Sequence, residues 1–122
     1  MFRGGVVTVY VSDMDRSIRF YTEALGMRLT ERHGDHWASL DGGPGLTIGL
    51  HPATPEVPAG QQGSIALGLY LDQSIATAVE SLASRGVTFS GPVIEDKALS
   101  LAFFKDPDGN PLYLAEMKPV HR

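Results

Sequence analysis

An internal repeat is the feature that most restricts how this chain of 122 residues can fold. The pattern Asp-x-Ser-Ile-x4-Glu-x-Leu begins at Asp15 and begins again at Asp72, 57 residues further on. Each copy follows a run of β-branched, aromatic or aliphatic residues, at 6–11 and at 65–71, that is typical of a strand. Two copies cannot build a solenoid, so the repeat predicts two related modules rather than an array.

A proline-rich segment marks the boundary between these modules. The segment 52–62 is rich in proline and poor in apolar residues, which predicts a linker. We therefore expect one domain, 1–122, that consists of a module at 1–51 and a module at 63–117.

Local patterns predict the same order of elements in both modules. The first helix is expected to be capped by Ser12 or Asp13 and to end at Gly26. The second helix is expected at 74–84, with Gly86 as its stop. Further strands are predicted at 27–31, 36–40, 46–51, 87–89, 93–96, 99–105 and 112–117. Asp106 and Asp108 lie in a turn with Gly109, which is expected to take a positive φ, and we interpret both carboxylates as structural.

Composition removes several classes of function. The chain has no cysteine, which excludes disulfides, zinc–thiolate sites, iron–sulfur clusters and a cysteine nucleophile. Its net charge of -4 and pI near 5.4 argue against a nucleic-acid partner. The sequence has no apolar run of bilayer length and no signal peptide at its start, so we expect a cytoplasmic protein without a membrane partner.

Two stretches, VYVSDMDRSIRFYTEALGM and the later FFKDPDGNPLYLAE, resemble the vicinal oxygen chelate superfamily. This superfamily includes glyoxalase I, bleomycin-resistance proteins, fosfomycin-resistance enzymes and extradiol dioxygenases. The resemblance covers nearly the whole chain, duplication included. It implies an α+β fold in which two βαβββ modules form a curled, cup-like mixed sheet with the ligand in the cup. Members commonly pair, so the resemblance also implies a homodimer.

Metal-dependent members hold one divalent ion with His, Gln or Glu side chains on four strands. The resemblance places the matching positions at Val6, Gly49, Ala66 and Tyr113. The first three have no side-chain donor atom, and one tyrosine does not make a metal site. We therefore predict neither the usual metal site nor another cofactor.

Strand parity indicates which side chains would line the cup, because alternate residues of a strand face opposite sides of the sheet. The predicted ligand-binding residues are Thr8, Trp37, Ser39, Thr47, His51, Phe103 and Tyr113. The aromatic rings would stack on a flat or largely apolar organic molecule, and the hydroxyls and imidazole would orient it. The small residues Gly49, Ala66 and Gly68 are expected to leave room for a bulky ligand.

Three functions remain open. The first is suggested by the resemblance to metal-free bleomycin-resistance proteins: the chain binds an antibiotic or toxic metabolite without altering it. A protein of this kind has no catalytic residue. Alternatively it is a lyase, isomerase or dioxygenase of the same superfamily that uses a non-standard site. Such a site would combine His51 with Tyr113, Glu56 or Glu116. The third alternative is an interaction module without a small ligand.

Overall fold

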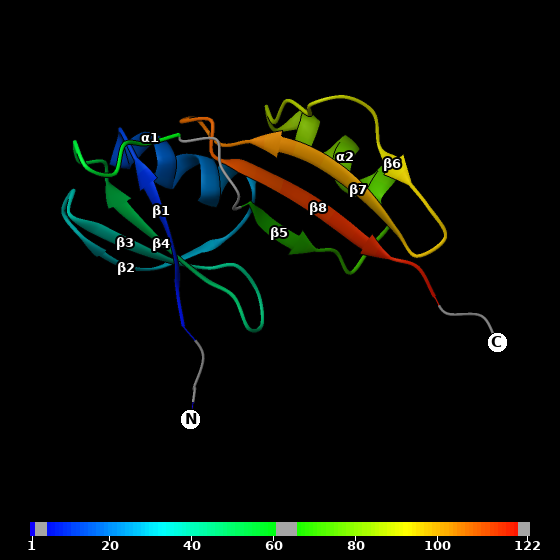
Figure 1. The fold of residues 1–122 in the computed structure, drawn as a ribbon, viewed down its shortest axis with the longest axis horizontal. Helices are drawn as coiled ribbons and strands as arrows, with labels where there is room; N and C mark the ends of the chain where they lie inside the picture. The colour runs from blue at the N-terminus through cyan, green and yellow to red at the C-terminus, as the bar shows by residue number, and fades with distance from the viewer. Residues whose placement is uncertain (2–4, 61–65, 120–122) are drawn as a thin grey trace. The chain divides into compact units, whose positions relative to one another are not determined.

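A computed structural model describes residues 1, 5–60 and 66–119 (Figure 1). Contacts divide the chain into a first unit, residues 1–61 with 107–110, and a second unit, residues 62–106 with 111–122. The predicted strand start at Ile65 and the end of the predicted linker lie outside the described residues.

The first unit holds one four-stranded mixed sheet. Its elements are β1 (Val7–Val11), α1 (Met14–Arg19), η1 (Phe20–Ala24), β2 (Arg28–His33), β3 (Trp37–Asp41) and β4 (Thr47–Pro52). The strands lie in the order β1-β4-β3-β2. β1 and β4 are parallel, whereas β3 is antiparallel to both β4 and β2.

The second unit repeats this arrangement with shorter edge strands. Its elements are β5 (Leu67–Tyr70), α2 (Ile75–Ser84), β6 (Ile94–Glu95), β7 (Leu99–Lys105) and β8 (Pro111–Met117). The order is β5-β8-β7-β6, and Figure 1 shows β8 between β5 and β7. The predicted α+β fold of two βαβββ modules is confirmed. The predicted strand at 87–89 is wrong, because Phe89 forms only an isolated bridge with Phe104.

Polar side chains begin both helices, and glycines end them. Asp13, not Ser12, caps α1 by accepting a hydrogen bond from the Arg16 backbone N–H at 3.0 Å. Ser74 caps α2 in the same way, and Gly86 ends it with φ 97°. In the described residues, no helix combines the length and the apolar character that crossing a membrane would need.

The first helix departs from the expected α geometry over its second half. η1 is a π-helix, in which the Leu25 N–H donates to the Phe20 carbonyl at 3.1 Å, five residues back. Gly26 then takes φ 79° and ends the helical segment, as expected. The apolar periodicity predicts a helix here, but it does not distinguish a wide turn from a regular one.

The core of each unit lies between its helix and one face of its sheet. In the first unit this face carries Val9, Leu40, Ile48 and Leu50, all buried, opposite the buried Met14 and Ile18 of α1. The corresponding buried residues of the second unit are Ala102, Phe104, Leu112 and Leu114 on the sheet and Ile75 and Ala78 on α2. Strand parity therefore leaves the other face of each sheet for the predicted site residues.

Candidate functional site

Strand register places five predicted site residues on one face of the first sheet. Thr8 and Ser39 both pair with Gly49, and Tyr10 pairs with His51. Since alternate residues share a face, this face also carries Trp37 and Thr47. We call it the first site face, and it consists of Thr8, Tyr10, Trp37, Ser39, Thr47, Gly49 and His51.

The polar residues of the first site face differ in how accessible they are. Thr8 and Thr47 are exposed, and Trp37 and His51 are half-buried. Ser39 is buried, and its hydroxyl shares a hydrogen bond of 3.0 Å with the Thr30 hydroxyl. The Thr30 hydroxyl also donates to the Ser39 carbonyl at 3.0 Å. The hydroxyl of Ser39 is therefore already used within the protein.

The ring of Trp37 covers Gly49 on the neighbouring strand. A Cβ added at Gly49 would lie 2.7 Å from Cζ2 of Trp37 and nearer still to Cη2. The expectation that Gly49 leaves room for a ligand is therefore wrong, because the indole ring occupies that space. A ring laid over a strand glycine compensates for the missing side chain and holds the ring in one orientation. Trp37 thus presents a fixed apolar surface.

His51 is held at the end of β4 by two neighbours. Its Nδ1 lies 2.8 Å from the Pro52 carbonyl oxygen, and its ring centroid lies 5.2 Å from that of Tyr10 at an interplanar angle of 54°. Pro52 is fixed in turn by its pairing with Val11. No described residue hydrogen-bonds to Nε2 of His51. The imidazole is therefore oriented by the protein on one side only.

The second sheet carries the other two predicted residues on its helix-free face. Phe103 pairs with Tyr113, and Tyr113 pairs with Gly68. We call this face the second site face, and it consists of Gly68, Tyr70, Leu101, Phe103, Tyr113 and Ala115. The rings of Phe103 and Tyr113 lie 5.8 Å apart at 46°, within the range of favourable aromatic pairs.

Tyr113 repeats on the second face what Trp37 does on the first. A Cβ added at Gly68 would lie 2.8 Å from Cε2 of Tyr113 and nearer to its Cζ and hydroxyl. The expectation of free space at Gly68 is therefore also wrong. Tyr70 remains 81% exposed and Phe103 37% exposed, so this face offers aromatic surface to the solvent.

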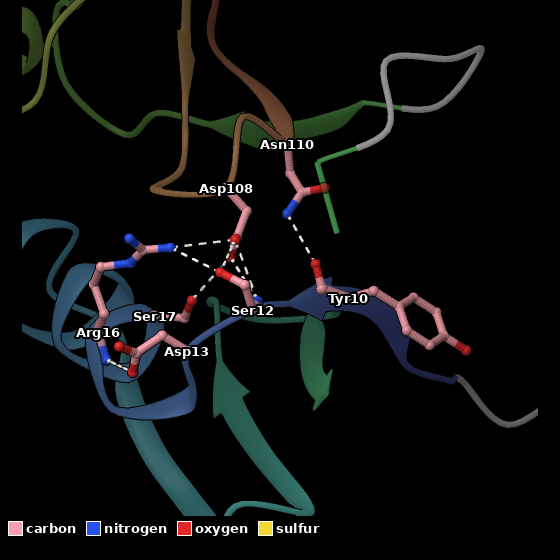
Figure 2. Close-up of polar contacts among 7 residues, drawn as sticks. All are labelled: Tyr10, Ser12, Asp13, Arg16, Ser17, Asp108 and Asn110. Carbon is pink, nitrogen blue, oxygen red and sulfur yellow. Dashed lines mark hydrogen bonds and ion pairs between the residues drawn. The ribbon is translucent and has the colours of Figure 1, made fainter. Parts of the chain in front are cut away.

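Asp108 forms the densest polar cluster of the first unit (Figure 2). Its side chain is only 5% exposed. The carboxylate accepts from the Ser12 backbone N–H at 3.2 Å, from the Ser12 hydroxyl, from Arg16 Nη2 at 3.2 Å and from the Ser17 hydroxyl at 3.5 Å. Gly109 takes φ 87°, as expected for this turn. The carboxylate therefore binds donors at the start of α1, where negative charge is favourable.

Figure 2 also shows how this cluster lies relative to Tyr10, a residue of the first site face. The Asn110 amide donates to the Tyr10 carbonyl at 3.3 Å, while the Tyr10 ring points away from Asp108. These contacts agree with the interpretation of Asp108 as structural.

Glu116, a possible partner for His51, is used elsewhere. Its carboxylate accepts from the Ile75 backbone N–H at 2.9 Å, at the start of α2. On β8, Glu116 alternates with Tyr113 and so lies on the helix side of its sheet. Glu56 is exposed and has no polar contact among the described residues. Within that part of the chain, no group of three His, Cys, Asp or Glu side chains is arranged to hold a metal ion.

The four positions that hold the metal in other members do not fit one here. Register makes Gly49 equivalent to Tyr113, and Val6 and Ala66 each directly precede the first paired residue of β1 and β5. Three of the four have no donor atom, and Tyr113 lies over Gly68. We therefore derive no chemistry from a metal ion at these positions.

A separate hollow of about 650 Å³ lies at the β3–β4 connection of the first unit. Thr47 is the one predicted site residue that lines it, beside Thr30, Asp41 and the loop 43–46. The hollow is thus at the end of the sheet rather than across the first site face.

Three carboxyl groups have a lowered pKa, and one of them belongs to Asp41, which pairs with Thr47. The hydrogen bond from Arg32 lowers the pKa of Asp15. Backbone N–H donors have the largest effect on the others: Gly43 lowers the pKa of Asp41, and Leu99 lowers that of Asp96. These groups stabilise loops and strand ends.

Strand parity places Tyr10 on the first site face, and its ring packs against His51. One contact of this face was missed by sequence reasoning. Thr30 reaches Ser39 from an irregularity in β2 between Leu29 and Glu31, which the sequence does not reveal.

The duplicated βαβββ units and their aromatic faces define a class of α+β proteins, and comparison with known proteins identifies the family. Residues 5–114 match the family described as Glyoxalase/Bleomycin resistance protein/Dioxygenase superfamily. The chain belongs to this superfamily, as the two motifs indicate.

Individual relatives carry different descriptions. An uncharacterised protein of Mycolicibacterium smegmatis is 36% identical over 88% of this chain and 87% of its own length. A lactoylglutathione lyase of Salmonella typhimurium is 30% identical over 92% of this chain and 90% of its own. Among solved structures, TnmS3, an antibiotic-binding protein from Streptomyces sp. CB03234, has a TM-score of 0.80 at 27% identity, over 97% of this chain and 98% of that one.

Proposed function

We propose that this protein binds a flat, largely apolar organic molecule without altering it, as in the sequestration of an antibiotic or toxic metabolite. The ligand-binding residues are Thr8, Trp37, Thr47, His51, Phe103 and Tyr113. The protein is proposed to act in the cytoplasm as a homodimer.

The observation that carries this proposal is the pair of rings seated on glycines. Trp37 over Gly49 and Tyr113 over Gly68 are each held by a neighbouring strand, so little side-chain freedom is lost when a ligand stacks on them. Tyr10 and Phe103 extend the aromatic surface of their respective faces. The structural likeness to TnmS3 supports the same function.

Ser39, by contrast, is not proposed to contact the ligand. It is buried, and its hydroxyl is bonded to Thr30. We propose that Ser39 holds β2 to β3 beneath the ligand.

The test uses Trp37, the only tryptophan of the chain, as a reporter of the first site face. Bleomycin, acridine and 2-naphthol are each titrated into the protein, and the tryptophan emission is followed. Each bound compound is then released by denaturation and its mass is measured. We expect saturable binding by at least one compound, with its mass unchanged. Absence of binding by all three, or a changed mass, would overturn the proposal.

An enzyme of the same superfamily is the second candidate. The observation that favours it is the sequence similarity to proteins named as lactoylglutathione lyases, at 30% and 31% identity. The His51→Ala variant distinguishes the two candidates. A binding protein keeps measurable affinity and has no turnover to lose, whereas an enzyme that depends on His51 loses turnover while its affinity remains.

A further inference from the structure

His51 is the one side chain of the first site face whose protonation pattern follows from its contacts. The Pro52 carbonyl oxygen can only accept a hydrogen bond. The contact of 2.8 Å between this oxygen and Nδ1 therefore places the proton on Nδ1. In the neutral imidazole, Nε2 then carries a lone pair and no proton.

Nε2 of His51 is also accessible. None of the described residues donates to it, yet the described residues contain no buried side-chain nitrogen or oxygen that lacks a hydrogen-bond partner. The atom must consequently reach the solvent. It lies on the same face as Trp37 and beside the ring of Tyr10, in a half-buried setting.

We propose that Nε2 of His51 selects aromatic ligands that carry a neutral hydroxyl or N–H group, by accepting a hydrogen bond from that group. This inference rests on the proposed function and adds its ligand class. The Tyr10 ring lies beside the imidazole, and the contact of Nδ1 with the Pro52 carbonyl oxygen orients it. An ether or an apolar analogue of the same shape leaves Nε2 without a partner.

The experiment compares 2-naphthol with its methyl ether, 2-methoxynaphthalene, in which a methyl group replaces the donor hydrogen. Their dissociation constants are measured by calorimetry for the wild type, for His51→Phe and for His36→Phe. His36 is an exposed turn residue outside the site face, so it provides the matched control.

We expect the preference for 2-naphthol over its ether to fall by about tenfold in His51→Phe and to stay unchanged in His36→Phe. Comparing the ratio of the two dissociation constants between the proteins cancels the difference in solubility between the probes. Equal ratios in all three proteins, with both probes bound, would overturn the inference and leave the proposed function standing. If neither naphthalene compound binds but bleomycin does, the inference about His51 fails and the proposed function still stands. If nothing binds, both fail.

A second measurement does not depend on any variant folding. A long-range ¹H–¹⁵N correlation spectrum of the wild type reports which ring nitrogen of His51 carries the proton. We expect Nε2 to be unprotonated in the free protein, and its resonance to move on addition of 2-naphthol but not of the ether. A free protein with the proton on Nε2 instead of Nδ1 would contradict the proposed acceptor.

Discussion

The two units share a backbone plan but carry different side chains at equivalent places. In the first unit, the row that crosses β1, β4 and β3 consists of Thr8, Gly49 and Ser39. In the second, the row across β5, β8 and β7 consists of Gly68, Tyr113 and Phe103. The row of the first unit therefore consists of small or hydroxylated residues, whereas the row of the second consists of a glycine and two aromatic residues.

Despite this difference, each unit places an aromatic ring over a strand glycine, but from a different strand. In the first unit the covered glycine is on β4 and the ring comes diagonally from β3. In the second the glycine is on β5 and the ring comes from the residue directly paired with it on β8. The backbone geometry is repeated, whereas the polarity of the two faces is not.

The helix starts show a similar contrast, and it gives the largest expected effect. Asp108→Ala removes the acceptor of Ser12, Arg16 and Ser17 at α1. We expect a loss of about 2–3 kcal/mol in the free energy of unfolding, since several donors, among them the buried Ser17, lose a charged acceptor that is itself only 5% exposed. Glu116→Ala removes one hydrogen bond, from the Ile75 N–H at 2.9 Å, and should cost about 1 kcal/mol.

Urea denaturation measures both losses, and Glu80→Ala on the exposed side of α2 is the control, expected within about 0.5 kcal/mol of the wild type. Equal costs for Asp108→Ala and Glu116→Ala would show that the denser cluster adds nothing.

The ring-on-glycine contacts give the next largest effect. Neither Gly49 nor Gly68 has a positive φ, so alanine is compatible with the backbone. Its Cβ nevertheless collides with a ring, and we expect Gly49→Ala and Gly68→Ala each to cost about 1–2 kcal/mol. In the Trp37→Leu and Tyr113→Leu backgrounds, the same changes should stabilise by about 0.5 kcal/mol, because a strand favours alanine over glycine. A cost that is independent of the background would contradict the contact.

Ligand affinity compares the two faces directly. Trp37→Leu and Tyr113→Leu should each weaken 2-naphthol binding about tenfold, on the order of 1.4 kcal/mol, through loss of aromatic surface. Ser39→Ala should change the affinity less than about twofold, since that hydroxyl is bonded to Thr30. Calorimetry measures all three. If only one of the aromatic substitutions has an effect, a single face binds the ligand.

The smallest effect is the response to acid. The pKa values of Asp15 and Asp41 in the first unit, and of Asp96 in the second, lie below the ordinary 3.8. Each charged carboxylate therefore stabilises the fold fully above pH 3.8, and this contribution is lost as the pH falls through the lowered pKa. Urea midpoints should be flat near neutral pH and fall below about pH 4. Asp41→Asn should reduce the decrease of the urea midpoint at low pH. An unchanged decrease would show that Asp41 does not contribute to it.

Much of the fold followed from local patterns because they act over short distances. The repeat, the cap at Asp13 and the glycine stops at 26 and 86 depend on neighbouring residues, and the structure has them. The predicted strand at 87–89 failed since a strand requires a partner along its length, and β7 offers Phe89 a single bridge. The π-helical turn at 20–24 was not predicted either, because apolar periodicity does not distinguish it from an α-helical turn.

The sequence by itself determined the family, the two modules and the parity that puts five candidate residues on one face. These follow from spacing along the chain, which a strand or helix converts directly into direction. Only the tertiary structure decided which of those residues remain available. Cross-strand contacts occupy the hydroxyl of Ser39 and the space above Gly49 and Gly68. Such contacts join residues whose distance in sequence carries no signal.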